Sequence, residues 1–98
     1  MAEFRLSERA KAKLVEIDAY TEQVFGRYQA DAYSAGFEKT FELLATFPGI
    51  GRSADELKAG YRRYRHQSHP IFYTEEAGHV LIRTIIHAAQ DLRPDLID

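Results

Sequence analysis

The sequence contains no cysteine among its 98 residues. This absence excludes disulfide bonds, thiolate nucleophiles and zinc sites with a sulfur ligand, and it suits a cytosolic protein. No apolar run approaches the roughly 20 residues that a membrane-spanning helix needs, so we expect no membrane partner. The first residues, Met-Ala-Glu-Phe-Arg-Leu, lack a basic region followed by an apolar one, and we therefore expect no signal peptide.

The sequence also lacks an excess of positive charge. It has 13 Lys and Arg residues against 15 Asp and Glu, which gives a formal net charge of −2. Proteins that bind nucleic acid by bulk electrostatic attraction are usually basic, so this balance leaves room only for a local basic patch. Apolar residues make up 45% of the chain and charged residues 29%. This composition and length predict one globular domain over residues 1–98.

The first half of the sequence predicts a strand followed by two helices. Phe4 and Leu6 alternate with charged residues, as in a short half-buried strand, and Ser7 is a favourable N-cap. From Ser7 to Gly26, small and apolar residues recur every three or four positions, which is typical of one helix face. The members of this stripe are Ala10, Leu14, Ile17, Thr21 and Val24.

A second helical stripe runs up to Pro48, which ends it. Its members are Ala30, Tyr33, Phe37, Phe41, Leu44 and Phe47. The short connection around Gly26 predicts an antiparallel helical hairpin. Gly36 lies inside the second helix, where glycine costs up to about 1 kcal/mol relative to alanine, and we expect it to allow close approach of the two helices.

The second half predicts a sheet. After a turn at 48–51 and a polar loop anchored by Leu57, strand-like runs cover residues 61–65, 69–74 and 80–86. Pro70 cannot donate a ladder hydrogen bond, so we expect it at the start of its strand or on an open edge. The order β-α-α-β-β-β predicts an α+β fold, in which the helical hairpin packs on one face of a small, mainly antiparallel sheet. The other face is expected to be partly open to a partner.

Basic and aromatic residues are densest around the first of these three strands: Lys58, Tyr61, Arg62, Arg63, Tyr64, Arg65, His66 and His69. Strand alternation places Arg63 and Arg65 on the face of Tyr61, and Arg62 on the face of Tyr64. Such a surface favours an acidic, apolar protein partner, because Arg and Tyr are frequent hot spots of interfaces. A solvated strand face and an RNA contact are the weaker alternatives.

The last strand carries Arg83 and His87. Alternation places both on the face of Leu81 and Ile85, opposite Val80, Ile82, Thr84 and Ile86. We expect Arg83 to pair with Glu38 or Glu42 of the second helix, because a buried charge needs a partner. His87 is a candidate general acid or base, although the sequence shows no residue that would position it.

Metal and cofactor sites are not indicated. His66 and His69 lie three positions apart, and on one strand they would point to opposite faces. No third clustered ligand accompanies them, so we expect no metal. Gly49-Ile50-Gly51 is too short for a phosphate-binding loop and leads into no helix, so we expect no cofactor either.

Six short segments follow one another along the chain: Phe4-Arg5-Leu6-Ser7-Glu8-Arg9-Ala10 with Leu14 and Ile17, Phe47-Pro48-Gly49-Ile50-Gly51-Arg52, Glu56-Leu57, Gly60-Tyr61-Arg62-Arg63, Ile71-Phe72-Tyr73, and Ile82-Arg83-Thr84-Ile85-Ile86-His87. In this order they resemble the ParE branch of the RelE/ParE toxin superfamily. The resemblance implies a small cytoplasmic bacterial toxin of a type II toxin–antitoxin pair, with the topology β-α-α-β-β-β. It also implies a hetero-oligomer with a ParD-like antitoxin that neutralises the toxin.

Two branches of this superfamily imply different activities. ParE-like members inhibit DNA gyrase and are not known as enzymes, whereas RelE-like members cleave mRNA on the ribosome. Many of the ribonucleases resemble one another in having Arg immediately before the apolar-apolar-Tyr of the third strand, where this sequence has Pro70. The resemblance therefore favours a non-enzymatic gyrase inhibitor. The alternatives are a ribosome-dependent ribonuclease acting through Arg63, Arg65, Arg83 and His87, and a decayed module that only binds antitoxin.

The expected contacts with partners fall in two groups. The candidates for antitoxin binding are Arg62, Arg63, Tyr64, Arg65, Tyr73 and Arg83. The candidates for target binding are Leu92, Arg93 and Leu96, in the tail that runs from Ala88 to Asp98. We expect no specific DNA binding by the toxin alone.

Overall fold

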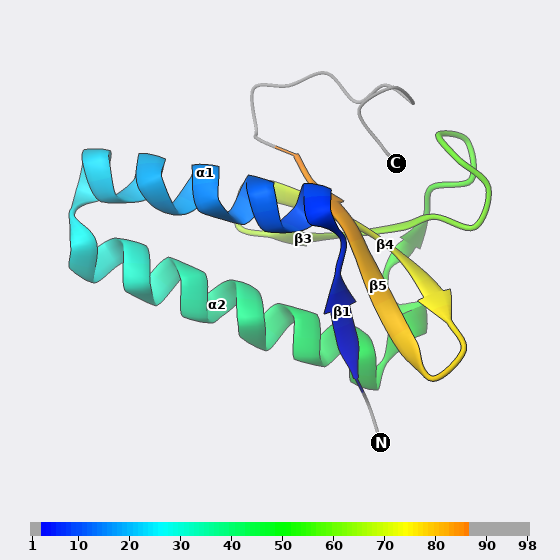
Figure 1. Ribbon diagram of the computed structural model, residues 1–98. Coiled ribbons are helices and arrows are strands. Elements are labelled where there is room, and N and C mark those ends of the chain that lie inside the picture. Colours follow the sequence, from blue (N-terminus) through cyan, green and yellow to red (C-terminus); the bar gives the residue numbers. More distant parts are fainter. Residues whose placement is uncertain (1–2, 87–98) are drawn as a thin grey trace.

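The computed structural model describes residues 3–86 as two helices packed on one face of a five-stranded sheet (Figure 1). In chain order the elements are β1 (Phe4–Leu6), α1 (Glu8–Phe25), α2 (Arg27–Thr46), the 3-10 turn η1 (Pro48–Ile50), β2 (Arg52–Ser53), β3 (Arg62–His66), β4 (His69–Glu76) and β5 (His79–Ile85). The expected α+β order is confirmed, with the two-residue strand β2 added to it.

The sheet is mixed, with the strand order β1-β5-β4-β3-β2. The first strand runs parallel to the last, with Phe4 opposite Val80 and Leu6 opposite Ile82. All other neighbours are antiparallel. Pro70 is the second residue of β4, so it lies at the start of its strand, as expected.

Ser7 connects the first strand to the first helix and also links β1 to the neighbouring strand β5. Its hydroxyl oxygen accepts a hydrogen bond from the N–H of Ala10 at 3.0 Å, which is the N-cap contact expected from the sequence. The same hydroxyl donates to the carbonyl of Arg83 on β5 at 2.6 Å. One side chain therefore fixes both the start of α1 and the pairing of β1 with β5.

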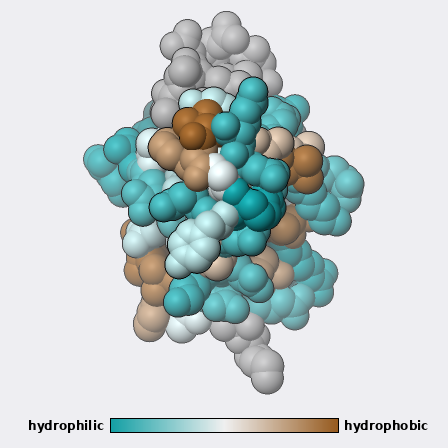
Figure 2. Space-filling model, turned by 90° about the vertical axis from the view of Figure 1, so that its left-hand side faces the viewer, coloured by the Kyte–Doolittle hydropathy of each residue, from teal (hydrophilic) through white to brown (hydrophobic). Residues whose placement is uncertain are grey.

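The two helices extend past the sheet at the end where they meet. Gly26 joins them with a φ of 93°, in the region that favours glycine. Val24 was expected in the buried stripe, but it is 50% exposed, because this end of the hairpin projects beyond the strands that would cover it (Figure 1). Seen from this end, apolar patches alternate with polar side chains (Figure 2). The hairpin end therefore offers no continuous apolar face.

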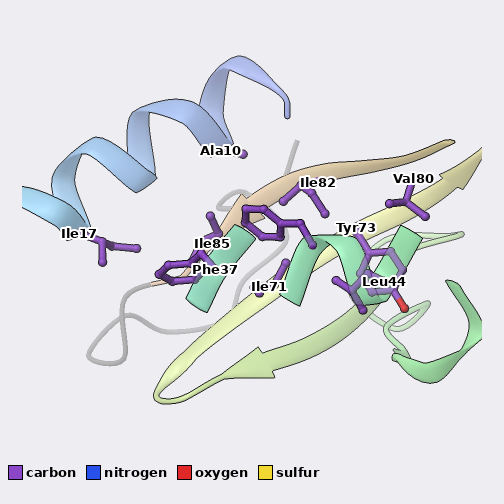
Figure 3. Close-up of a cluster of buried hydrophobic side chains, with 10 residues drawn as sticks. Ala10, Ile17, Phe37, Leu44, Ile71, Tyr73, Val80, Ile82 and Ile85 are labelled. Carbon is purple, nitrogen blue, oxygen red and sulfur yellow. The ribbon is translucent and has the colours of Figure 1, made fainter. Parts of the chain in front are cut away.

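The main core lies between the helices and the sheet (Figure 3). Phe37 and Leu44 from α2 meet Ile71, Tyr73 and Ile82 from the central strands, and all five are at most 2% exposed. A smaller cluster covers part of the opposite sheet face, formed by Ala54, Leu57, Tyr61, Phe72 and Ile86. The loop before β3 therefore closes part of the face that the sequence left open.

A register shift in the central pair of strands breaks the alternation expected for β5. Phe72 pairs with Thr84 and Tyr73 pairs with Ile82, so Arg83 is the extra residue of a bulge. Ile82 and Ile85 consequently both belong to the core beneath the helices, whereas Ile86 belongs to the opposite cluster. The expectation that Ile86 shares a face with Ile82 is wrong because a bulge shifts every later side chain by one position.

Gly36 marks a close approach, but not of the two helices. A Cβ atom built on it would lie 2.8 Å from Cε1 of His66 on β3. The expectation of helix–helix contact is therefore wrong, and the glycine instead lets α2 pack directly against the end of β3. The imidazole that fills this space is held between the rings of Tyr33 and Phe37.

We expect Gly36→Ala to lower the free energy of unfolding by about 1–2 kcal/mol, because the imidazole must move within a packed site. This loss outweighs the gain in helix propensity of up to about 1 kcal/mol. Urea denaturation followed by circular dichroism measures it. Gly49→Ala is the matched control, since a Cβ there would meet nothing within 4 Å. A stabilised Gly36→Ala protein would contradict the close approach.

Candidate functional site

Three of the arginines expected to contact a partner, Arg62, Arg63 and Arg83, form hydrogen bonds or ion pairs with other residues of this chain. Nη1 of Arg62 donates to the carbonyl of Gly51 at 2.9 Å, and its Nε lies 3.3 Å from Glu75. Nη2 of Arg63 lies 2.7 Å from a carboxylate oxygen of Glu56. These pairs are partly exposed, so their contribution to stability is small, but they compete with any external anion for the same guanidinium groups.

Arg83 lies on the sheet face away from the helices, which corrects the expected pairing with Glu38 or Glu42. Its Nε donates to the hydroxyl of Thr74 at 3.2 Å, and its Nη2 lies 3.5 Å from Glu76. The guanidinium also lies 5.6 Å from the ring centre of Tyr61. The hydrogen bond from Thr74, together with the charge of Arg83, holds the pKa of Glu76 below its usual value.

Two further arginines are not engaged in this way. Within residues 3–86, no side-chain hydrogen bond or ion pair is formed by Arg52 or Arg65, and both are exposed. They line a hollow of about 480 Å³ beside β3, whose other walls are Ile50, Arg63, Tyr64 and Pro70. This hollow is the candidate site, and we call it the β3-edge groove.

The hydroxyl of Tyr73 shapes this groove from inside the protein. It donates to the carbonyl of Pro48 at 2.6 Å and accepts a hydrogen bond from the N–H of Gly51 at 2.9 Å. These bonds hold the 48–51 turn, so β2 pairs with β3 only at Arg52 and Ser53. Burial raises the pKa of this hydroxyl.

Tyr73 was expected to contact a partner, but its side chain is 0% exposed. Its place in the structure is therefore internal, where it supports the wall of the β3-edge groove. Tyr64, also expected as a contact, is partly buried and lines the groove.

His66 and His69 lie on the same side of the sheet, which corrects the expectation from strand alternation. A two-residue turn at Gln67 and Ser68 separates β3 from β4, so the two histidines face each other across the hairpin. Both rings pack against Tyr33 and Phe37 of α2. No clear signal marks this turn in the sequence, because Gln67-Ser68 is not one of the pairs, such as Asn-Gly or Asp-Gly, that are typical of two-residue hairpins.

The two histidines pack close to the hydroxyl of Tyr33. The hydroxyl of Tyr33 lies 2.5 Å from Nδ1 of His69. Burial lowers the pKa of His66, and burial raises the pKa of Tyr33. Among the described residues, no group of three His, Cys, Asp or Glu side chains is arranged to hold a metal ion.

The three arginines proposed for ribonuclease activity do not converge on one point. Arg83 lies beside Tyr61, just before β3, whereas Arg65 lies four strand residues further on, which corresponds to about 13 Å. Arg63 lies between them with its guanidinium on Glu56. His87 lies outside the described residues, as do Leu92, Arg93 and Leu96.

Arg52 was missed by the sequence reasoning. It belongs to the Phe47–Arg52 segment, but nothing in that segment indicates that a two-residue strand places it beside Arg63. In the part of the chain that the structure describes, neither α1 nor α2 is long and apolar enough to cross a membrane.

Comparison with known proteins decides the family. The model of the family described as "ParE toxin of type II toxin-antitoxin system, parDE" matches residues 4–92. The chain belongs to the ParE toxin family. It is 40% identical over 96 residues to the toxin ParE1 of Caulobacter vibrioides, which covers 98% of this chain and 99% of that protein. It is 32% identical over 94 residues to the toxin ParE1 of Mycobacterium tuberculosis, which covers 95% and 96% respectively.

The ParE fold is also found among solved structures. A chain of the chromosomal ParDE toxin–antitoxin system from P. aeruginosa superimposes with a TM-score of 0.75 over 87% of this chain and 94% of that one, at 15% identity. The ParE-like topology inferred from the six sequence segments is thus confirmed. The chain is a ParE toxin of a type II toxin–antitoxin system.

Proposed function

We propose that this ParE toxin is neutralised by a ParD-like antitoxin and that the free toxin inhibits DNA gyrase without catalysing a reaction. The observation that carries the proposal is its membership of the ParE family along almost the whole chain. The similar P. aeruginosa chain comes from a ParDE toxin–antitoxin system, which is consistent with an antitoxin of the ParD type.

The geometry of the basic residues supports a non-catalytic role. Cleavage of RNA needs cations that converge on one phosphate, together with a positioned acid or base. Arg63 and Arg83 instead each hold a carboxylate of their own chain, and Pro70 occupies the strand position before Ile71. His66 is packed behind the sheet against α2, where it cannot reach a substrate on the face of Arg83.

The test is a direct comparison of the two activities with purified protein. Gyrase with relaxed plasmid and ATP is expected to lose supercoiling activity as toxin is added, and the antitoxin encoded beside it is expected to restore that activity. Ribosomes programmed with mRNA are expected to leave the mRNA intact. Cleavage of mRNA with undiminished supercoiling would contradict the proposal, and Arg83→Ala would then be expected to abolish the cleavage.

Target contact by Leu92, Arg93 and Leu96 is the second part of the proposal. These residues follow the last described strand, and their mixture of apolar and basic side chains suits a protein surface. Replacing all three by alanine is expected to weaken inhibition of gyrase while leaving antitoxin binding within about threefold. Equal loss of both activities would indicate that the tail supports the fold instead.

A further inference from the structure

The β3 edge carries unpaired backbone groups at Arg65. Hydrogen-bonded and non-hydrogen-bonded pairs alternate along an antiparallel ladder. Arg65 faces Pro70, which has no N–H, and the carbonyl of Pro70 accepts from the N–H of Ile86 on the other side, at 2.9 Å. The pair is therefore not hydrogen-bonded, and the N–H and C=O of Arg65 point away from β4.

Within residues 3–86, neither of these two groups takes part in a hydrogen bond. The neighbouring strand β2 pairs only with Arg62 and Arg63, because the chain before it turns aside into η1. The hydrogen bonds of Tyr73 to Pro48 and Gly51 hold the turn in that position. The edge therefore ends in a short stretch of strand that faces the groove, with one donor and one acceptor available.

Two of the three arginines beside this edge make no ion pair within residues 3–86. Arg52 and Arg63 are cross-strand partners, and Arg65 follows on the same face two positions along β3. Arg63 is held by Glu56, whereas Arg52 and Arg65 make no ion pair within the described residues. In a chain of net charge −2, this pair of free guanidinium groups is a local site for an anion.

We propose that an extended acidic segment of the antitoxin adds to the β3 edge at Arg65 and places its carboxylates on Arg52 and Arg65. The proposal deepens the proposed function and rests on it, since it assumes an antitoxin partner. It identifies the mode of recognition as strand addition, in which backbone bonds supply affinity and alternate side chains supply specificity. It also shifts the antitoxin contact from Arg62, Arg63 and Arg83 to Arg52 and Arg65, which have no side-chain partner within residues 3–86.

A peptide fits this edge better than a nucleic acid does. The backbone of Arg65 offers both an N–H donor and a C=O acceptor, spaced as a β-strand requires. A phosphate diester has acceptors only, so it would leave the carbonyl without a partner. In the bound peptide, an acidic residue opposite Arg65 would be flanked by apolar residues that meet Ile50 and Tyr64 in the groove.

The first test measures the affinity of the antitoxin for a double variant, Arg52→Ala with Arg65→Ala. Its dissociation constant is expected to rise 10- to 100-fold at low salt, and the salt dependence of binding to decrease. The matched control is Lys11→Ala with Lys39→Ala, which removes the same charge from exposed helix positions and is expected to change the constant less than threefold. An equal loss of antitoxin affinity in the two variants would show that the effect depends only on net charge, and would overturn the proposal.

The second test measures whether the backbone N–H of Arg65 becomes hydrogen-bonded in the complex. Hydrogen exchange of the Arg65 amide is expected to slow at least 100-fold when antitoxin is added to the wild-type toxin, because strand addition gives this N–H an acceptor. Unchanged exchange at Arg65 in a complex that forms normally would overturn the proposal while leaving the proposed function intact. Failure of the antitoxin to bind the wild-type toxin at all would instead contradict the proposed function.

Nucleic acid probes test the alternative that the β3-edge groove binds phosphate groups. A 20-nucleotide RNA and a DNA duplex of equal length are expected to bind the wild-type toxin and the Arg52→Ala, Arg65→Ala variant equally weakly. Binding that is strong and is lost in the double variant would assign the groove to phosphates and overturn the peptide assignment. Both arginines are exposed, so the variant is expected to retain its fold and its circular dichroism spectrum.

Discussion

Replacing Tyr73 by alanine is expected to lower the free energy of unfolding by about 3–5 kcal/mol, the usual cost of removing a large aromatic side chain from a core. The ring is fully buried beneath α2 beside Leu44 (Figure 3). Its hydroxyl also satisfies the carbonyl of Pro48 and the N–H of Gly51, which would lose their partner. Because small domains are stable by only about 5–15 kcal/mol, urea denaturation should show a large fall in the midpoint.

Tyr73→Phe separates the hydroxyl from the ring. The ring stays, so the expected loss is smaller, about 1–3 kcal/mol, which corresponds to leaving buried polar groups without a partner. The Gly51 amide is expected to exchange faster with solvent, since its acceptor is gone. Tyr28→Ala is the control, because this side chain is 85% exposed and its removal should change stability by less than about 0.5 kcal/mol. A Tyr73→Phe protein as stable as the wild type would contradict the role of the hydroxyl.

The second large effect is a loss of stability in mild acid. Burial lowers the pKa of His66 below its ordinary value near 6.5, so the folded state binds fewer protons than the unfolded state. The stability from the neutral ring is fully present above that ordinary value and falls as the pH drops below it. The slope is at most about 1.4 kcal/mol per pH unit and ends once the pH passes the folded-state pKa.

The surroundings of His66 explain why protonation is unfavourable. Its ring meets Tyr33 and Phe37 from α2, and the hydroxyl of Thr40 lies 3.4 Å from its Nδ1. Across the hairpin it faces His69, a second titratable group. Its buried Nε2 has no hydrogen-bond partner within residues 3–86, and no carboxylate pairs with the ring there. A proton on this ring would therefore bring a charge into an aromatic site without a counterion.

Urea denaturation at intervals between pH 7.5 and 5 measures the acid effect. The ordinary pKa values of Asp and Glu in an unfolded chain are about 4, so the carboxyls whose folded-state pKa values are lowered, Glu3, Asp55 and Glu76, add to the loss of stability only at the acid end of this window. His66→Gln is expected to be less stable at neutral pH but to show a flatter dependence on pH. His79→Gln, at the β4–β5 turn, is the control and should keep the wild-type slope. An identical slope in His66→Gln would assign the effect to another group.

The sequence was sufficient for the elements that carry a strong periodic pattern. Both helices have a clear stripe and a terminal signal, such as Ser7 at the start of α1 and Pro48 after α2. The strands around Phe72 and Ile82 were recognisable from their β-branched and aromatic residues. The parallel pairing of β1 with β5 could not be predicted from local pattern, because the two strands are far apart in the sequence, with Ser7 bonded to Arg83 76 positions away.

Most of what was missed depends on single-residue departures from regular structure. The bulge at Arg83 moves Ile86 to the other face, and the turn at Gln67 brings His66 opposite His69. Neither feature has a reliable signature in one sequence. The candidate site shows the same limit: Arg65 was predicted as a contact, whereas Arg52 depends on a strand of two residues.

The parallel pairing of β1 with β5 has a consequence for how the toxin is made. Phe4 to Leu6 form the first described element, whereas the strand that they pair with, β5, is the last one and ends at Ile85. The bond from Ser7 to the carbonyl of Arg83 joins residues 76 positions apart. Such long-range contacts form late, because the chain between them must first be ordered. A nascent chain that stops before β5 leaves β1 without its partner strand. A prematurely terminated product is therefore expected to have neither the complete sheet nor toxic activity.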